Sequence, residues 1–345
     1  MASKSVIVIK FGTASITTQS GGINEKIISE IARQVAALQP YYSIVLVSSG
    51  AVGAGKEFLK NFKGSLIERK AAAAIGNPLL VGVYGKYFSK YGISIAQSLC
   101  ERHHFANRNQ FLQLKETYQE LWKNGIIPIA NENDVVSNLE LKFSDNDELA
   151  TLIATGFGAS HLLFSTSVGG LLDKEGNIIP NVDEINASIF DLANKEKTAV
   201  GLGGMVSKLT FARLASTMGI KVVIFGIDKE DGILNAMEGK AGTVFIPKAA
   251  NLSARKKWLG SGSLISGIVK VDSGAEKALL KRKSLLAVGV KKVEGAFEAN
   301  EIIQIQNEKG EQIAVARANF SSKTIVENLN TQNFEIAHAD DIVVA

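Results

Sequence analysis

A glycine-rich segment ends in a lysine at the start of a predicted helix, and it reads Gly201-Leu202-Gly203-Gly204-Met205-Val206-Ser207-Lys208. Glycines allow backbone N–H groups to approach an anion closely, and the first turn of a helix carries a partial positive charge to which Lys208 adds a full one. We interpret the segment as a phosphate-binding turn. A glycine cluster before a helix is more often a permissive turn, so this interpretation needs partners elsewhere in the chain.

A second glycine-rich segment, Gly50–Lys56, follows the apolar run Ile44–Val47 and almost matches the P-loop pattern. Glu57 stands where that pattern needs a Ser or Thr to coordinate magnesium, and a carboxylate there would face the triphosphate. The segment is therefore predicted to be a tight turn from strand to helix. Ser48 and Ser49, at the end of the strand, are left available for contact with a substrate.

Short apolar runs alternate with longer amphipathic ones through the first two-thirds of the chain. This alternation predicts an α/β fold, in which an open, mainly parallel sheet is sandwiched by helices. The predicted strands are 6–9, 44–47, 93–96, 126–130 and 162–165, and the predicted helices are 24–38 with Asn24 as N-cap, 65–89, 107–123 and 147–158.

Polar residues follow several of these strands, where the active sites of open α/β sheets lie. They are Lys10, Ser48–Gly50, Asn131–Asp134 and Thr166–Ser167, with the acidic loop Asp145–Asp147 opening a helix. Each has an ordinary structural explanation when taken singly, such as an N-cap for Asp145 or a surface charge for Lys10. Two lysines, several acids and a phosphate-type turn on one sheet edge together predict phosphoryl transfer.

Phosphoryl transfer without a P-loop would depend on positioning and on charge neutralisation by Lys10 and Lys208. No histidine or serine–base pair is placed to remove a proton from an acceptor. A carboxylate acceptor needs no base, because it is already ionised at neutral pH, and its product would be an acyl phosphate. The identity of the acceptor stays open at this level.

Five motifs occur in an order that matches a known family. They are Val8-Ile9-Lys10-Phe11-Gly12-Thr13, Val47-Ser48-Ser49-Gly50-Ala51, Asn131-Glu132-Asn133-Asp134, Asp145-Asn146-Asp147 and Gly203-Gly204-Met205-Val206-Ser207-Lys208. On these motifs the chain resembles the glutamate 5-kinases of the amino acid kinase family. The resemblance implies transfer of the γ-phosphoryl group of ATP, with Mg²⁺, to the side-chain carboxylate of L-glutamate, which is the first step of proline biosynthesis. Another kinase of the family, with a different carboxylate or phosphate acceptor, is the alternative.

The resemblance also implies roles for individual residues. Lys10 and Lys208 would stabilise the transferred phosphoryl group and Asp147 would hold both lysines, while Ser49, Asp134 and Asn146 would bind glutamate. The positions implied to contact ATP are Lys10, Gly12, Gly50, Thr166, Ser167, Leu202, Gly203, Gly204, Met205, Val206, Ser207 and Lys208. Ser167 and Gly169 stand where acids are common in the family, which we interpret as a change in nucleotide affinity.

The C-terminal part changes character near Gly260–Ser263, after which short β-like runs alternate with turns. We expect a kinase domain at 1–258 and a small, mostly β domain at 264–345 that resembles the PUA domain. That domain binds RNA in other proteins, so a non-catalytic RNA-binding or regulatory protein is a further alternative. The modest charge and the lack of an aromatic-rich basic stretch favour a structural or regulatory role here.

Composition sets the remaining expectations. The chain has 345 residues, 46% hydrophobic content, a formal charge of +4 and one cysteine, Cys100, which excludes an intrachain disulfide and is predicted to be buried. No secretory signal or membrane span is evident, so a cytoplasmic location is expected. His103-His104 lacks a third metal ligand at a recognisable spacing and is predicted at a helix end or loop. The family resemblance adds a homo-oligomer, dimer or tetramer, and feedback inhibition by proline, with sensitivity in the loop 135–143.

Overall fold

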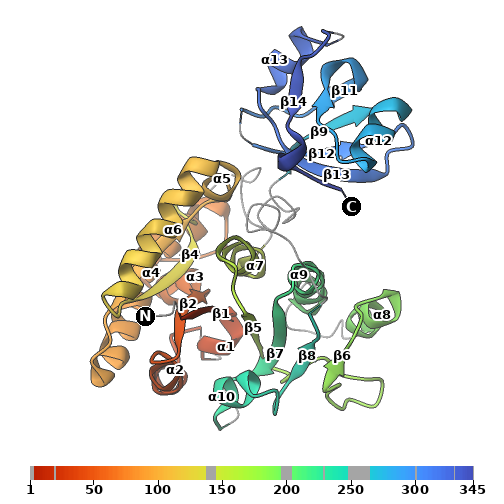
Figure 1. Ribbon diagram of the computed structural model, residues 1–345. Helices are drawn as coiled ribbons and strands as arrows, with labels where there is room; N and C mark the ends of the chain where they lie inside the picture. The colour runs from red at the N-terminus through yellow and green to blue at the C-terminus, as the bar shows by residue number, and fades with distance from the viewer. Residues whose placement is uncertain are drawn as a thin grey trace. The chain divides into compact units, whose positions relative to one another are not determined.

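The structure of the chain is a computed structural model that describes residues 4–18, 21–136, 145–195, 204–227, 230–247, 265–299, 301–329 and 331–344. By compactness the chain forms two units, Met1–Glu101 with Glu116–Ala250 and Arg102–Lys115 with Asn251–Ala345. Each unit is described by itself (Figure 1). No helix in these ranges is both long and apolar enough to span a membrane.

The first unit contains an eight-stranded sheet with the order β3-β4-β2-β1-β5-β7-β8-β6. All of its strand pairs are parallel except β7 with β8, which confirms the prediction of an open, mainly parallel sheet. The strands are β1 (Ser5–Phe11), β2 (Tyr42–Ser48), β3 (Ile95–Cys100), β4 (Ile127–Glu132), β5 (His161–Thr166), β6 (Asn181–Val182), β7 (Lys221–Gly226) and β8 (Thr243–Phe245).

Helices cover both faces of this sheet, as the strand sequences require, because central strands without polar alternation must be buried on both sides. In Figure 1, α7 and α9 lie on one side of the sheet and α2 and α10 on the other. The helices of this unit are α1 (Thr13–Ile16), α2 (Glu25–Leu38), α3 (Ala51–Gly55), α4 (Leu66–Phe88), α7 (Asn146–Phe157), α8 (Ala187–Lys195), α9 (Gly204–Thr217) and α10 (Gly232–Met237). Helix α5 (Arg102–Ala106) belongs to the second unit, and α6 (Arg108–Lys123) begins in the second unit and ends in the first.

The alternation of side chains along β1 sends its residues to opposite faces. Ile7, Ile9 and Phe11 join a buried cluster with side chains of α2, α4 and α10. Lys10 points to the opposite face and ion-pairs with Asp147 of α7. The strand therefore contributes both to the core and to the polar centre described below.

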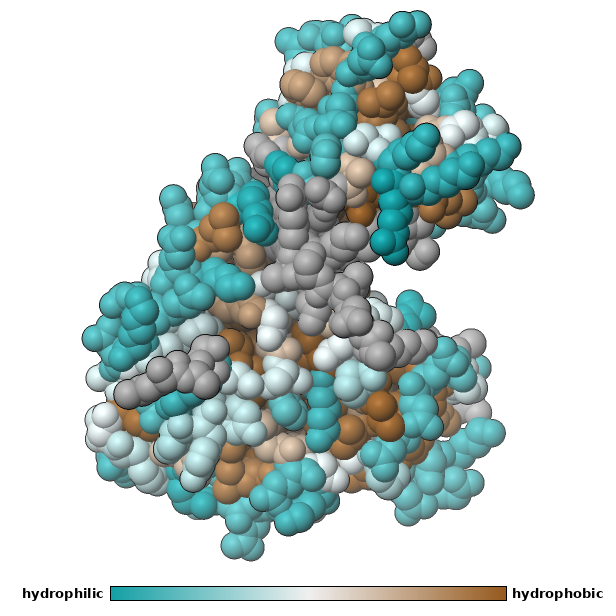
Figure 2. All heavy atoms as spheres, viewed as in Figure 1, coloured by the Kyte–Doolittle hydropathy of each residue, from teal (hydrophilic) through white to brown (hydrophobic). Residues whose placement is uncertain are grey.

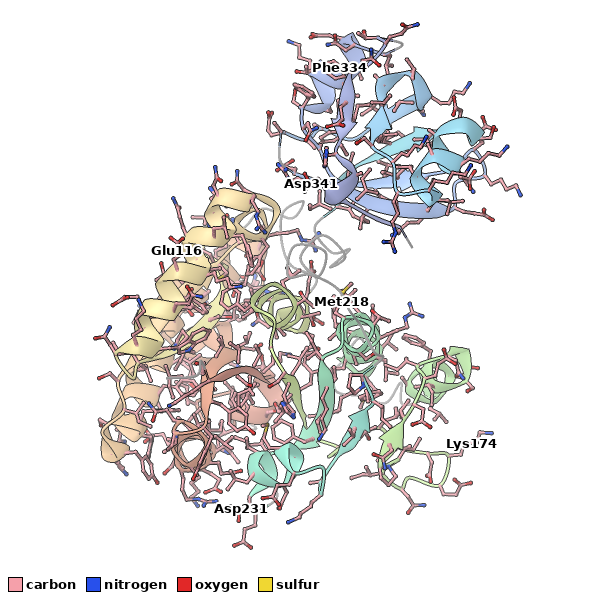
Figure 3. All side chains as sticks on the ribbon, in the orientation of Figure 1. Glu116, Lys174, Met218, Asp231, Phe334 and Asp341 are labelled. Atoms are coloured by element: carbon pink, nitrogen blue, oxygen red, sulfur yellow. The ribbon has the colours of Figure 1, made fainter. Side chains whose placement is uncertain are left out.

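Side-chain caps fix where the principal helices begin. The Asn24 side chain accepts from the Ile27 N–H, as predicted, and Ser65 forms a capping box with Glu68 at the start of α4. Asp231, labelled in Figure 3, lies at the start of α10 and forms an ion pair with Arg33 of α2. These contacts stabilise α2, α4 and α10.

Helix α6 is amphipathic, with one buried side and one polar, exposed side. Phe111 and Tyr118 are buried, whereas the opposite side of the helix is polar, with Glu116 on it (Figures 2 and 3). His103 and His104 lie in the last turn of α5, in agreement with their predicted place at a helix end. Cys100 is fully buried, as predicted, and burial raises the pKa of its thiol to about 11.

The second unit contains a mixed five-stranded sheet with the order β11-β9-β12-β13-β15 and a two-stranded β10-β14 pair. A single apolar cluster joins the sheet to its helices. This confirms the predicted small, mostly β C-terminal domain. Its elements are β9 (Ile265–Val271), α12 (Ser273–Leu280), β10 (Leu285–Leu286), β11 (Val290–Glu294), β12 (Ile302–Gln306), β13 (Gln312–Arg317), α13 (Ser322–Glu327), β14 (Glu335–Ala337) and β15 (Ile342–Val344).

Candidate active site

Two lysines and one aspartate from three different elements meet at the carboxyl end of the sheet. The Lys10 Nζ atom of β1 lies 2.6 Å from Asp147 Oδ1, and the Lys208 Nζ atom of α9 lies 3.0 Å from Asp147 Oδ2. Their exposed fractions are only 5%, 1% and 7% for Lys10, Asp147 and Lys208. Two positive charges on one carboxylate leave a net positive charge in a buried place, which suits an anionic ligand.

Burial changes the protonation balance of Lys10. Desolvation lowers the pKa of Lys10 below its ordinary value, and the neighbouring charge of Lys208 lowers it too, whereas Asp147 opposes both effects. Without Asp147, two ammonium groups would be buried side by side, and only the weaker effect of Asp145 would offset their repulsion. Asp147 therefore offsets part of the desolvation of Lys10 and, by pairing with both lysines, fixes their position.

The start of α7 positions Asp147. Asp145 is the N-cap, and its Oδ1 atom accepts from the backbone N–H groups of Asp147 and Glu148. The other oxygen, Oδ2, accepts from the Ser207 hydroxyl on the first turn of α9. One carboxylate thus caps α7 and links it to α9, one residue before Lys208, so that the helix starts carrying Asp147 and Lys208 are held together.

A cavity of about 570 Å³ adjoins this cluster, since Asp145 and Asn146, the two residues before Asp147, line it. Ser49, Asp134 and Asn146, the three residues expected to bind substrate, all line it, together with Asp145. They come from the ends of β2 and β4 and from the start of α7. The fold therefore brings together residues that lie about a hundred positions apart, because parallel strands end at the same sheet edge.

A chain of amide side chains fixes the orientation of Asn146. The backbone N–H of Glu132 donates to Asn131 Oδ1 at 2.9 Å, so this oxygen is an acceptor. Asn146 Nδ2 donates to the same oxygen and to Ser49 Oγ, each at 2.9 Å. Its own Oδ1 is buried and has no hydrogen-bond partner among the described residues. A buried orphan acceptor is costly, so a ligand with N–H donors would satisfy it.

The residues expected to contact ATP lie around the same sheet edge. Gly12 follows β1, and its N–H donates to Ser165 Oγ at 3.4 Å. Gly50 follows β2 with φ of +103°, a conformation that favours glycine. Thr166 ends β5, the neighbour of β1, and Ser167 follows it, but no described contact joins them to the lysine cluster. Gly204, Met205, Val206, Ser207 and Lys208 form the first turns of α9.

Two of the expected nucleotide contacts, Leu202 and Gly203, lie outside the described residues. So does most of the loop 135–143, where sensitivity to an inhibitor was expected. The predicted start of a helix at the glycine turn is confirmed, since α9 begins at Gly204. Lys208 lies one turn into that helix, and its Nζ atom also lies 3.4 Å from the Gly204 carbonyl oxygen.

Sequence reasoning missed several polar residues of the site. Asn77 of α4 accepts from Asn131 Nδ2 at 3.0 Å, and Ser165 connects Gly12 to Ser15. Lys56 and Arg69 line the cavity. A hydroxyl at the end of a buried strand was a usable signal for Ser165, whereas Asn77 and Arg69 lie inside a long helix, where spacing alone does not reveal a site.

Comparison with known proteins identifies the family of the chain. The model of the amino acid kinase family matches residues 5–226, about two-thirds of the chain. The chain belongs to the amino acid kinase family. A PUA domain model matches residues 267–331, in the second unit.

Relatives within the amino acid kinase family match over nearly the whole length. The glutamate 5-kinase of Caldanaerobacter subterraneus subsp. tengcongensis is 35% identical over 362 residues, which cover 98% of this chain and 97% of that protein. The glutamate 5-kinase of Rippkaea orientalis is 37% identical over 354 residues, with 98% and 94% covered. Carbamate kinase from Giardia lamblia bound to AMP-PNP has the same fold, with a TM-score of 0.51 at 18% identity over 72% of this chain and 99% of that one.

Proposed function

We propose that the chain is a glutamate 5-kinase, which transfers the γ-phosphoryl group of ATP to the side-chain carboxylate of L-glutamate and begins proline biosynthesis. The observation that carries this proposal is the buried Lys10–Asp147–Lys208 cluster next to a cavity lined by Ser49, Asp134 and Asn146. The full-length similarity to glutamate 5-kinases of several bacteria supports the choice of acceptor.

The chemistry needs positioning and charge more than proton transfer. A carboxylate oxygen of glutamate attacks the γ-phosphorus, an O–P bond forms, the bond to the β,γ-bridging oxygen breaks, and ADP leaves. No proton is removed from the acceptor, because a carboxylate is ionised at neutral pH. Lys10 and Lys208 stabilise the charge on the transferred group, and Asp147 keeps the two ammonium groups in place.

The substrate ammonium fits the other wall of the cavity. Asp134 supplies a carboxylate, and the buried Oδ1 atom of Asn146 supplies an acceptor that lacks a partner among the described residues. A protonated amine has three donors and can satisfy both. Ser49, which accepts from Asn146 Nδ2, holds that amide in the orientation that presents Oδ1.

Magnesium would enter with the nucleotide. The described residues contain no group of three or more His, Cys, Asp or Glu side chains that could hold a metal ion, and the Asp145 and Asp147 carboxylates are engaged by donors. Mg²⁺ commonly binds substrate phosphates and water with few protein ligands. When bound, it would neutralise phosphate charge, in addition to the two lysines.

Hydroxylamine trapping tests the proposal directly, because an acyl phosphate is captured as a hydroxamate. Purified protein with ATP, Mg²⁺ and L-glutamate should give γ-glutamyl hydroxamate, and Lys10→Ala should give none above background. A panel of acetylglutamate, aspartate and UMP separates the alternative acceptors of the family. Activity with one of these and not with glutamate would overturn the proposal.

Further aspects of the function are proposed with it. We place the kinase domain at 1–258 and the PUA domain at 264–345, the latter in a structural or regulatory role. Filter binding of structured RNA at low salt tests the RNA-binding alternative. We further propose that the protein forms a homo-oligomer, either a dimer or a tetramer, which sedimentation tests. We also propose a cytoplasmic location, where ATP is supplied. Feedback inhibition by proline is proposed as well, and inhibition kinetics test it.

A further inference from the structure

The cavity wall carries charges of both signs. Carboxylates of Glu132, Asp134 and Asp145 line it together with two cations, Lys56 and Arg69. These two cations come from the end of α3 and from the first turn of α4, helices that pack closely together (Figure 1). A cavity with both signs of charge on its wall suits a zwitterionic ligand.

The Arg69 guanidinium forms no ion pair with a carboxylate in the described part of the first unit. Glu68, its neighbour in sequence, is committed to the cap of α4, because its Oε2 atom accepts from the backbone N–H groups of Lys63 and Ser65. The guanidinium is therefore available to a ligand that enters the cavity.

One charged group of the proposed substrate, the α-carboxylate, still needs a partner in the cavity. Its side-chain carboxylate must lie toward Lys10 and Lys208, and its ammonium toward Asp134 and Asn146. The α-carboxylate then needs a cation elsewhere on the cavity wall. A guanidinium matches a carboxylate with two parallel N–H donors, which an ammonium cannot offer.

We infer that Arg69 binds the α-carboxylate of the amino acid substrate and thereby selects α-amino dicarboxylates over amino acids that lack this group. The inference rests on the proposed function, since it names how the same cavity holds glutamate. Lys56 is the weaker candidate, because its amine lies against the backbone of Gly21, where a β-carbon would be 2.4 Å from Nζ. Arg69 acts on binding and stays away from the reacting atoms.

The test compares L-glutamate with 4-aminobutyrate, which keeps the ammonium and the reacting carboxylate and lacks only the α-carboxylate. The wild-type protein should prefer glutamate in kcat/KM. Arg69→Ala should lower this preference about 10- to 100-fold through a higher KM for glutamate, the range for a charged hydrogen bond. Arg69→Lys should restore part of it. Lys60→Ala, an exposed lysine before α4 that does not line the cavity, is the matched control and should leave the preference unchanged.

The outcomes separate the two proposals. No hydroxamate from glutamate with the wild-type protein would reject the proposed function and this inference with it. Turnover of glutamate with an unchanged preference in Arg69→Ala would reject the inference alone, as would loss of the preference in Lys56→Ala only. If 4-aminobutyrate is not turned over, its Ki against glutamate replaces kcat/KM. A Ki raised in Arg69→Ala as much as the KM for glutamate would then indicate general damage to the cavity and overturn the inference.

Discussion

Gly76 of α4 lies against Ala51 of α3 so closely that a β-carbon on Gly76 would stand 1.7 Å from the Ala51 carbonyl oxygen. The contact is reciprocal, because a β-carbon on Gly55 would stand 2.0 Å from the carbonyl oxygen of Ala72. Two helices can approach in this way only where each has a glycine at the point of contact, here Gly55 and Gly76. Since α3 and the start of α4 form one wall of the cavity, this packing sets the shape of the acceptor site.

Gly76→Ala is therefore expected to destabilise the protein by about 1–3 kcal/mol, the usual cost of overpacking, and to lower Tm by about 3–10 °C. It should also raise the KM for glutamate, because α3 has to move. Gly82→Ala is the matched control: it lies in the same helix, with nothing within 4 Å of the added carbon. That variant should be neutral or more stable by up to about 1 kcal/mol. Equal thermal melting of the two variants would contradict the packing argument.

Lys208→Ala should lower kcat far more than it raises the KM for glutamate, because the ammonium acts on charge that develops in the transition state. The loss should be about 10²- to 10³-fold, the effect of removing one preorganised donor. Without Lys208 the cluster keeps one cation for one carboxylate and loses its net positive charge. Lys174→Ala, in an exposed turn, is the control. An unchanged kcat in the hydroxamate assay would remove Lys208 from the site.

Asp134→Ala should show the opposite pattern, a higher KM for glutamate with the KM for ATP nearly retained. The residue lines the cavity and is proposed to hold the substrate ammonium. Glutarate, which lacks that ammonium, is the diagnostic probe: the preference for glutamate over glutarate should fall in Asp134→Ala and persist in Asn133→Ala, whose side chain contacts Glu101 instead. Loss of ATP affinity would place Asp134 on the nucleotide side.

Much of this architecture could be predicted from the sequence, since buried parallel strands are continuous apolar runs and their ends share one edge. β3 was predicted at 93–96 and lies at Ile95–Cys100. As an edge strand it is only partly buried and shows no apolar run, while the buried Ile93 precedes it. Asn131 and Glu132 were expected to follow the strand 126–130 but end β4 instead, because the amide chain supplies buried partners to Asn131.

The cavity wall was harder to predict than the charge centre. Lys10, Asp147 and Lys208 come from motifs at strand and helix ends, where topology alone indicates convergence. Arg69 lies inside a helix, and its place in the cavity depends on the close packing of α3 and α4. That packing depends in turn on Gly55 and Gly76, whose spacing in the sequence does not indicate that they face each other.

His161, at the start of β5, provides a prediction about pH. Burial, with the nearby charge of Lys221, lowers its pKa to about 4 from the ordinary value of 6.5. Between these pH values the unfolded chain binds a proton at His161 that the folded chain does not. The contribution of the neutral His161 to the free energy of unfolding is therefore fully present above pH 6.5 and falls as the pH falls toward 4. Partial exposure reduces the effect to about 1–2 kcal/mol between pH 7 and pH 5.

Urea titrations at pH 7 and pH 5 measure this effect, and His161→Gln is the variant that should lose it. The side chain of glutamine does not titrate, so the free energy of unfolding of His161→Gln should change less between the two pH values than that of the wild-type protein, by about 1–2 kcal/mol. If the wild-type protein and His161→Gln lose equal stability at pH 5, His161 is not the source of the acid sensitivity. The polar neighbours Ser160 and Lys221 would then keep the imidazole ring more hydrated than its burial indicates.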